Sequence, residues 1–70
     1  MILKKKFYPL KTGYVLHLIT AKDKKGIYYF IGVFDSEHPE KPIEKFYYRN
    51  TNLANRKYKE CREKYSRKKW

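Results

Sequence analysis

The apolar and polar positions of this 70-residue chain follow one period before Asn50 and another after it. Between Tyr14 and Arg49 the apolar residues form short runs rich in β-branched and aromatic side chains, which are typical of strands. After Asn50 the apolar residues recur at spacings of 4, 3 and 4, as expected for one narrow helix face. The residues on that face are Ala54, Tyr58, Cys61 and Tyr65. The pattern predicts an α+β fold, in which a small antiparallel sheet precedes one C-terminal helix packed on one sheet face.

Three strands are expected, over residues 14–20, 27–34 and 43–49, and residues 2–8 add a fourth if they join the sheet. The first two form a hairpin, because the turn at residues 23–26 ends in Gly26, which accepts a positive φ. Pro9 lacks a backbone donor and restricts the N-terminal segment to a sheet edge. The chain is therefore one domain, with a basic arm or edge strand at 1–12, a sheet at 14–49 and a helix at 51–68. Asn50, Thr51 and Asn52 offer side chains for the helix N-cap.

Both faces of this sheet are expected to be apolar. Ile27, Tyr29, Ile31 and Val33 alternate along the second strand and should meet the helix. The opposite face collects Val15, His17, Ile19, Tyr28, Phe30, Lys45, Tyr47 and Arg49. One helix covers one face only, so the second needs the N-terminal segment, a second subunit or a ligand. A chain this small buries only about 60% of its unfolded surface, which also favours help from a second copy or a ligand.

The charge of the chain indicates the chemical class of a ligand for the second sheet face. The net charge is +11, from 18 Lys and Arg against seven Asp and Glu, and it is interleaved with 13 aromatic residues. Residues 51–70 hold eight cations and two acids, whereas residues 26–50 hold three cations and four acids. Such a surface attracts polyanions, and tyrosines set among the cations offer faces on which bases stack. The composition therefore favours binding of nucleic acid, either DNA or RNA.

In this interpretation Lys and Arg contact phosphates while Tyr or Phe stack with bases. The residues expected to bind are Lys4, Lys5, Lys6, Lys22, Lys24, Lys25, Tyr28, Lys45, Tyr47, Arg49, Arg56, Lys59 and Arg67. Gly32, in mid-strand, would let a ligand or another backbone come close. The alternative for the same face is a second hydrophobic layer, closed by Ile2, Leu3 and Phe7 or by a dimer partner.

Catalytic chemistry has no recognisable motif in the chain. There is no phosphate-binding glycine loop, zinc pattern or hydrolase elbow, so neither enzymatic activity nor a metal or cofactor is expected. The acidic loop that contains Asp35, Glu37, His38 and Glu40 lacks a metal-ligand spacing and is interpreted as solvated. His17 is expected to pack within its strand and Cys61 to act as a small buried hydrophobe. A ribonuclease that uses His17 or His38 is a further hypothesis for the function of the protein.

Three features that the sequence lacks indicate the cellular compartment of the protein. Its lone cysteine forms no internal disulfide, and the N-terminus has no apolar signal region. No apolar run approaches the ~20 residues of a membrane span. A cytoplasmic protein without a membrane partner is therefore expected.

The order of sheet and then helix carries one resemblance. With its Gly-Ile-Tyr-Tyr strand opening and Tyr-Arg-Asn-Thr-x-x-Ala helix start, the stretch 26–56 is similar to the arm-binding N-terminal domains of phage and transposon integrases. Those domains lay a three-stranded sheet into a DNA groove, so the resemblance implies DNA binding. The connection over residues 35–42 is longer than in that pattern. The second hypothesis is an inhibitor or accessory factor of a phage or mobile element, which binds an acidic or nucleic-acid-bearing protein. Retardation of an oligonucleotide separates this hypothesis from the first.

Overall fold

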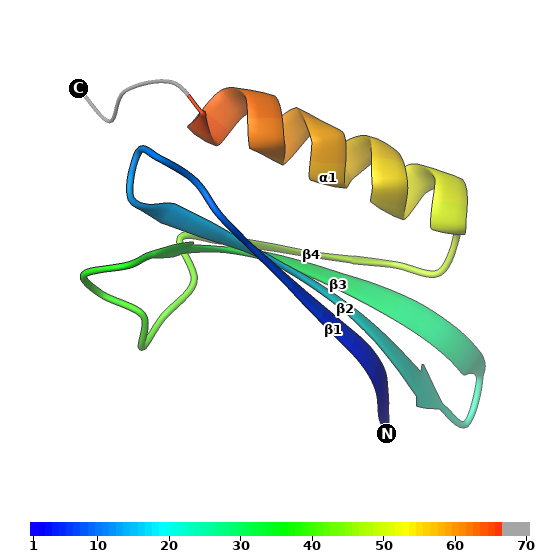
Figure 1. Ribbon diagram of the computed structural model, residues 1–70. Helices are drawn as coiled ribbons and strands as arrows, with labels where there is room; N and C mark the ends of the chain where they lie inside the picture. Colours follow the sequence, from blue (N-terminus) through cyan, green and yellow to red (C-terminus); the bar gives the residue numbers. More distant parts are fainter. Residues whose placement is uncertain (67–70) are drawn as a thin grey trace.

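The computed structural model describes residues 1–66, which form a four-stranded antiparallel sheet with one helix across it (Figure 1). The elements are β1 (Ile2–Pro9), β2 (Tyr14–Asp23), β3 (Gly26–Asp35), β4 (Glu44–Tyr48) and α1 (Thr51–Tyr65). The strands lie in the order β1-β2-β3-β4, so each is paired with its neighbour in sequence. The predicted α+β fold is confirmed, in its four-stranded form.

The N-terminal segment is an edge strand. Lys5 pairs with Ile19 and Phe7 pairs with His17, and a register irregularity lies between Ile2 and Lys4. One alternative for the second sheet face was closure by Ile2, Leu3 and Phe7; it is wrong, because β1 hydrogen-bonds to β2 and widens that face. The side chains of these residues are 53%, 47% and 55% exposed.

The β2–β3 hairpin extends further than its apolar residues suggested. Both strands continue to a two-residue turn, Lys24–Lys25, and Gly26 has the positive φ, 122°, that its place after the turn predicted. The Asp23 side chain accepts a 2.8 Å hydrogen bond from the Lys25 amide and so stabilises the turn. The hairpin tip therefore holds two lysines at a defined position at one end of the sheet.

The helix begins as its sequence indicates. Asn50 is the N-cap, and its side-chain oxygen accepts hydrogen bonds from the amides of Asn52 and Leu53 at 2.8 and 3.2 Å. The helix ends at Tyr65, with Ser66 as C-cap; the expected continuation to residue 68 lies outside the described residues. Across residues 1–66, no helix combines the length and the hydrophobicity that a bilayer crossing requires.

The core lies between α1 and one face of the sheet. The predicted helix face is buried, and it packs on the fully buried side chains of Leu16, Ile31 and Val33. The helix does not reach the hairpin end of β3, so the expectation that Ile27 meets it is wrong: Ile27 is 45% exposed. Tyr29 still reaches α1, where its hydroxyl lies 2.6 Å from the Thr51 Oγ1 atom. The opposite face carries no element of residues 1–66, and we call it the open face.

Candidate nucleic-acid interface

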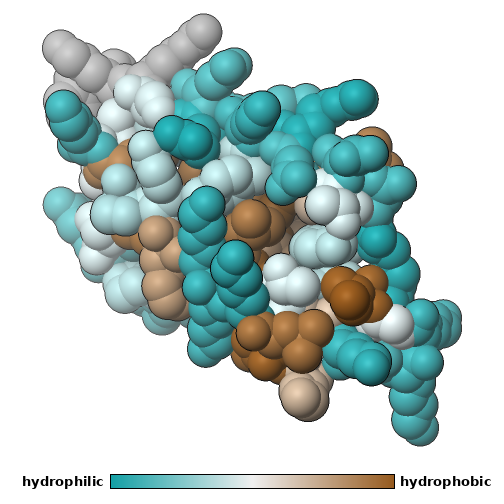
Figure 2. Space-filling model, turned by 45° about the vertical axis from the view of Figure 1, so that its right-hand side comes forward, coloured by the Kyte–Doolittle hydropathy of each residue, from teal (hydrophilic) through white to brown (hydrophobic). Residues whose placement is uncertain are grey.

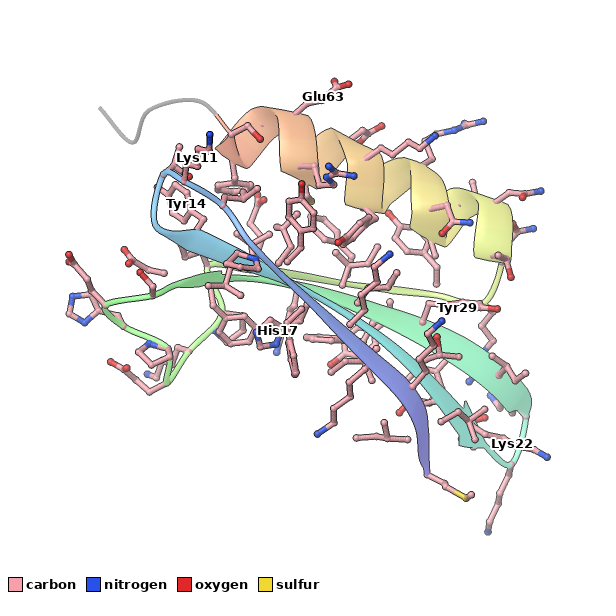
Figure 3. The ribbon with its side chains drawn as sticks, viewed as in Figure 1. Lys11, Tyr14, His17, Lys22, Tyr29 and Glu63 are labelled. Atoms are coloured by element: carbon pink, nitrogen blue, oxygen red, sulfur yellow. The ribbon has the colours of Figure 1, made fainter. Side chains whose placement is uncertain are left out.

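Six rings from all four strands lie on the open face, and we call them the aromatic row: Phe7, His17, Phe34, Phe30, Tyr47 and Tyr28. Figure 3 shows His17 below the strands, on the side away from α1. The His17 ring lies between Phe7 and Phe34, with centroid distances of 4.5 and 4.3 Å. At the other end, Tyr47 lies 5.1 Å from Phe30 and 6.4 Å from Tyr28.

Gly32 lies between Phe30 and Phe34, at the centre of the aromatic row. A Cβ atom at this position would lie 2.8 Å from ring atoms of both Phe30 and Phe34, so the two rings lean over the glycine from either side. The expectation that Gly32 leaves room for a ligand is therefore wrong. The missing side chain instead allows two phenylalanines of one strand to form a nearly continuous ring surface.

His17 is held as a packing residue, as its strand position predicted. Burial lowers its pKa, and the charge of Lys5 lowers it further, so the imidazole is neutral at neutral pH. Its environment is two aromatic rings and a cation on the same face. That environment gives no support to the ribonuclease hypothesis.

Three cations of the expected set flank the aromatic row. Lys5 and Lys45 lie opposite Ile19 and Gly32 in the sheet register, so both are on the open face. The Arg49 guanidinium lies over the Tyr28 ring, with 5.7 Å between its carbon and the ring centroid. Alternation thus correctly placed Tyr28, Lys45, Tyr47 and Arg49 on one surface. Phe7 and Phe34 were not among the expected binding residues. Alternation along β3 places Phe34 on the same face as Tyr28, whereas Phe7 joins that face through the pairing of β1 with β2.

A depression of about 390 Å³ lies at the hairpin end of the open face. It is lined by Asp23, Tyr28, Tyr47, Tyr48 and Arg49. The Arg49 Nη1 and Nη2 atoms donate to the two carboxylate oxygens of Asp23, at 3.1 and 2.7 Å. These hydrogen bonds are the largest cause of the low pKa of Asp23, about 2. The sequence indicates only a turn position for Asp23, because its partner Arg49 lies 26 positions away along the chain.

The remaining expected cations are divided between other surfaces. Lys24 and Lys25 lie at the hairpin tip, and Lys22 lies beside it (Figure 3). Lys4 and Lys6 pair with Thr20 and Leu18 on the helix side of the sheet, and Lys6 Nζ lies 6.0 Å from the Tyr58 ring. Arg67 lies outside the described residues. The structure therefore brings only some of the expected binding residues together on the open face.

The outer face of α1 is a separate, mixed-charge surface. Arg56 and Lys59 are exposed there. Figure 2 shows hydrophilic side chains (teal) over the top of the molecule, where Figure 1 places α1, and hydrophobic patches (brown) lower, among the strands. Lys57 pairs with Glu60 at 2.9 Å, and Glu63 points away from the sheet (Figure 3). The helix and the sheet separate this surface from the aromatic row.

The acidic loop carries an exposed contact between His38 Nδ1 and Glu40 Oε1 at 3.8 Å. Among residues 1–66, no three His, Cys, Asp or Glu side chains are placed to hold one metal ion.

Comparisons of the chain with protein-family models, curated proteins and solved structures find no match. The resemblance to integrase arm-binding domains therefore stays a prediction from the sequence.

Proposed function

We propose that the protein is a small nucleic-acid-binding module without catalytic activity, and that its open face binds a single strand. The observation that carries the proposal is the aromatic row on a sheet face that no element of residues 1–66 covers. Duplexes hide the flat faces of their bases, whereas unpaired bases can stack on exposed rings. The row therefore favours single strands of DNA or RNA over duplexes.

The cations around the row supply the electrostatic part of binding. Lys5 and Lys45 flank the rings, and Lys24 and Lys25 extend the positive surface at the hairpin tip. Contacts from these four lysines to phosphates would release counterions, so log affinity should fall with log salt at a slope of roughly −3. Such contacts read no sequence and hold the strand along the sheet.

Fluorescence anisotropy of labelled oligothymidine and oligouridine, measured across a salt series, tests the proposal. Tyr47→Ala should weaken binding about 5- to 150-fold, because base–aromatic stacking contributes ~1–3 kcal/mol. Tyr47 is 61% exposed, so its truncation leaves the core intact. Ile27→Ala is the matched control, since Ile27 is exposed on the neighbouring strand but belongs to the opposite face. Equal affinities for Tyr47→Ala and Ile27→Ala, or no binding at low salt, would contradict the proposal.

A second candidate function is docking to another protein through β1. This edge strand leaves one side unpaired within residues 1–66 and exposes Ile2, Leu3 and Phe7, as surfaces used for strand addition do. The three lysines in the strand favour an acidic partner. Absence of oligonucleotide binding, together with loss of partner binding in Phe7→Ala, would favour this function over the first.

A further inference from the structure

The depression at the hairpin end of the aromatic row combines groups that the rest of the open face lacks. Two tyrosine rings, Tyr28 and Tyr47, form its apolar part, and an arginine paired with an aspartate forms its polar part. A ring surface next to a fixed set of hydrogen-bond donors can recognise an unpaired base. The base stacks on the rings, and the donors select it by the acceptors on its edge.

Arg49 is held in one orientation. Asp23 accepts one N–H from each terminal nitrogen, and the Tyr28 ring lies against the guanidinium. Arginine has five N–H donors, and its Nε–H lies parallel to one of the terminal N–H groups. Within residues 1–66 that fork donates no hydrogen bond to another residue, so it is available to a ligand. Because the side chain is already ordered, binding through the fork loses little conformational entropy.

The charge of the pair favours a neutral ligand over a phosphate. The Asp23 carboxylate neutralises Arg49, so a second anion would gain little attraction and would be repelled by Asp23. A base with two adjacent acceptors suits the two parallel donors. Guanine presents O6 and N7, and bidentate contact of Arg with this edge is the commonest specific base contact. Cytosine presents O2 and N3, but the larger purine covers more of the two tyrosine rings.

We infer that this depression binds one unpaired guanine, which packs against the Tyr28 and Tyr47 rings and accepts two hydrogen bonds from the Arg49 fork that Asp23 orients. The inference rests on the proposed function: it adds one position that selects a particular base to an open face whose other positions only stack with bases. The protein would then choose single strands that contain a guanine.

The test compares four oligonucleotides of equal length, about eight nucleotides, in fluorescence anisotropy. One is all thymidine, and the others carry one central guanine, adenine or cytosine. A single guanine avoids quadruplexes, and a short strand can shift until its guanine reaches the depression. The guanine strand should bind about tenfold more tightly than the thymidine strand, within the discrimination expected of one bidentate contact.

Two variants assign the preference to the pair. Arg49→Lys keeps the charge but removes the fork, so the roughly tenfold ratio of affinities between the guanine and thymidine strands should fall to about one. Asp23→Asn should also reduce the preference. Glu44→Gln is its matched control: it makes the same change in charge at a carboxylate paired with Lys64, and it should retain the preference. Circular dichroism confirms that each variant is folded.

The outcomes separate the two proposals. Binding of all four strands with equal affinity, a preference for another base, or a preference that survives Arg49→Lys would overturn the guanine site and leave single-strand binding in place. Absence of binding to every strand would overturn the proposed function as well.

Discussion

The Tyr65 hydroxyl donates a 2.5 Å hydrogen bond to the Glu44 carboxylate and so joins the last turn of α1 to the first residue of β4. Lys64 adds a 3.2 Å ion pair to the same carboxylate. The hydrogen bond from Tyr65 is the largest cause of the lowered pKa of Glu44. Tyr65 is buried, so one side chain contributes to the core and to a polar link between the helix and the sheet.

Tyr65→Phe should lower the free energy of unfolding by about 1–2 kcal/mol, because it removes a hydrogen bond to a charged acceptor and keeps the buried ring. Urea titration measures the change. Tyr29→Phe is the control, since it removes an exposed hydroxyl contact to Thr51, at 2.6 Å, and should cost less. Equal losses in the two variants would show that the Tyr65–Glu44 hydrogen bond adds nothing beyond an exposed one.

The Asp23–Arg49 pair predicts part of the dependence of stability on pH. The pair lowers the pKa of Asp23 from 3.8 to about 2. The folded state then favours the carboxylate, so the stabilisation is present above pH 4 and is lost as the pH falls towards 2. Asp23→Asn should therefore show a smaller drop in melting temperature than the parent chain over this range. Glu63→Gln, which changes a carboxylate that points away from the sheet, should follow the parent curve (Figure 3). Superimposable curves for Asp23→Asn and the parent would refute the prediction.

Gly32→Ala should affect binding more than stability. The new methyl group would meet the ring ends of Phe30 and Phe34 at 2.8 Å. Both rings can turn away, at a cost of about 1 kcal/mol for displaced rotamers. The aromatic row would then be broken at its centre, and we expect at least about fivefold weaker binding of oligothymidine, equivalent to one lost base stack. Chemical denaturation and anisotropy measure the two effects. Unchanged affinity would mean that the row does not act as one surface.

Charge reversals should distinguish the two basic surfaces. Replacing Lys24 and Lys25 by Glu, at the hairpin tip, should weaken single-strand binding strongly and reduce its salt dependence. Replacing Arg56 and Lys59 by Glu changes the charge equally, but these residues lie on the outer face of α1. Their field at the open face is screened at physiological salt, so the effect should be smaller. A larger effect of the helix pair would locate the binding surface on α1.

The faces of the elements could be predicted because they depend on spacing along the chain. Ala54, Tyr58, Cys61 and Tyr65 share a helix face whatever that helix packs against, since 3.6 residues make a turn. Lys45, Tyr47 and Arg49 share a sheet face because side chains alternate along a strand. The turn at Gly26 likewise follows from local backbone geometry. Local periodicity therefore indicated the fold class and the central part of the candidate site.

The contacts that give the open face its chemistry arise from strand pairing across the sheet. His17 lies between Phe7 and Phe34 because β1 pairs with β2 at the edge and β2 pairs with β3 in one particular register. Arg49 meets Asp23 because β4 pairs with β3 and ends beside the β2–β3 turn. Spacing within a strand divides its residues into two alternating sets, but strand order and register decide which face each set joins and which neighbours it meets there. A shift of register by a single residue would move a whole strand's side chains to the other face.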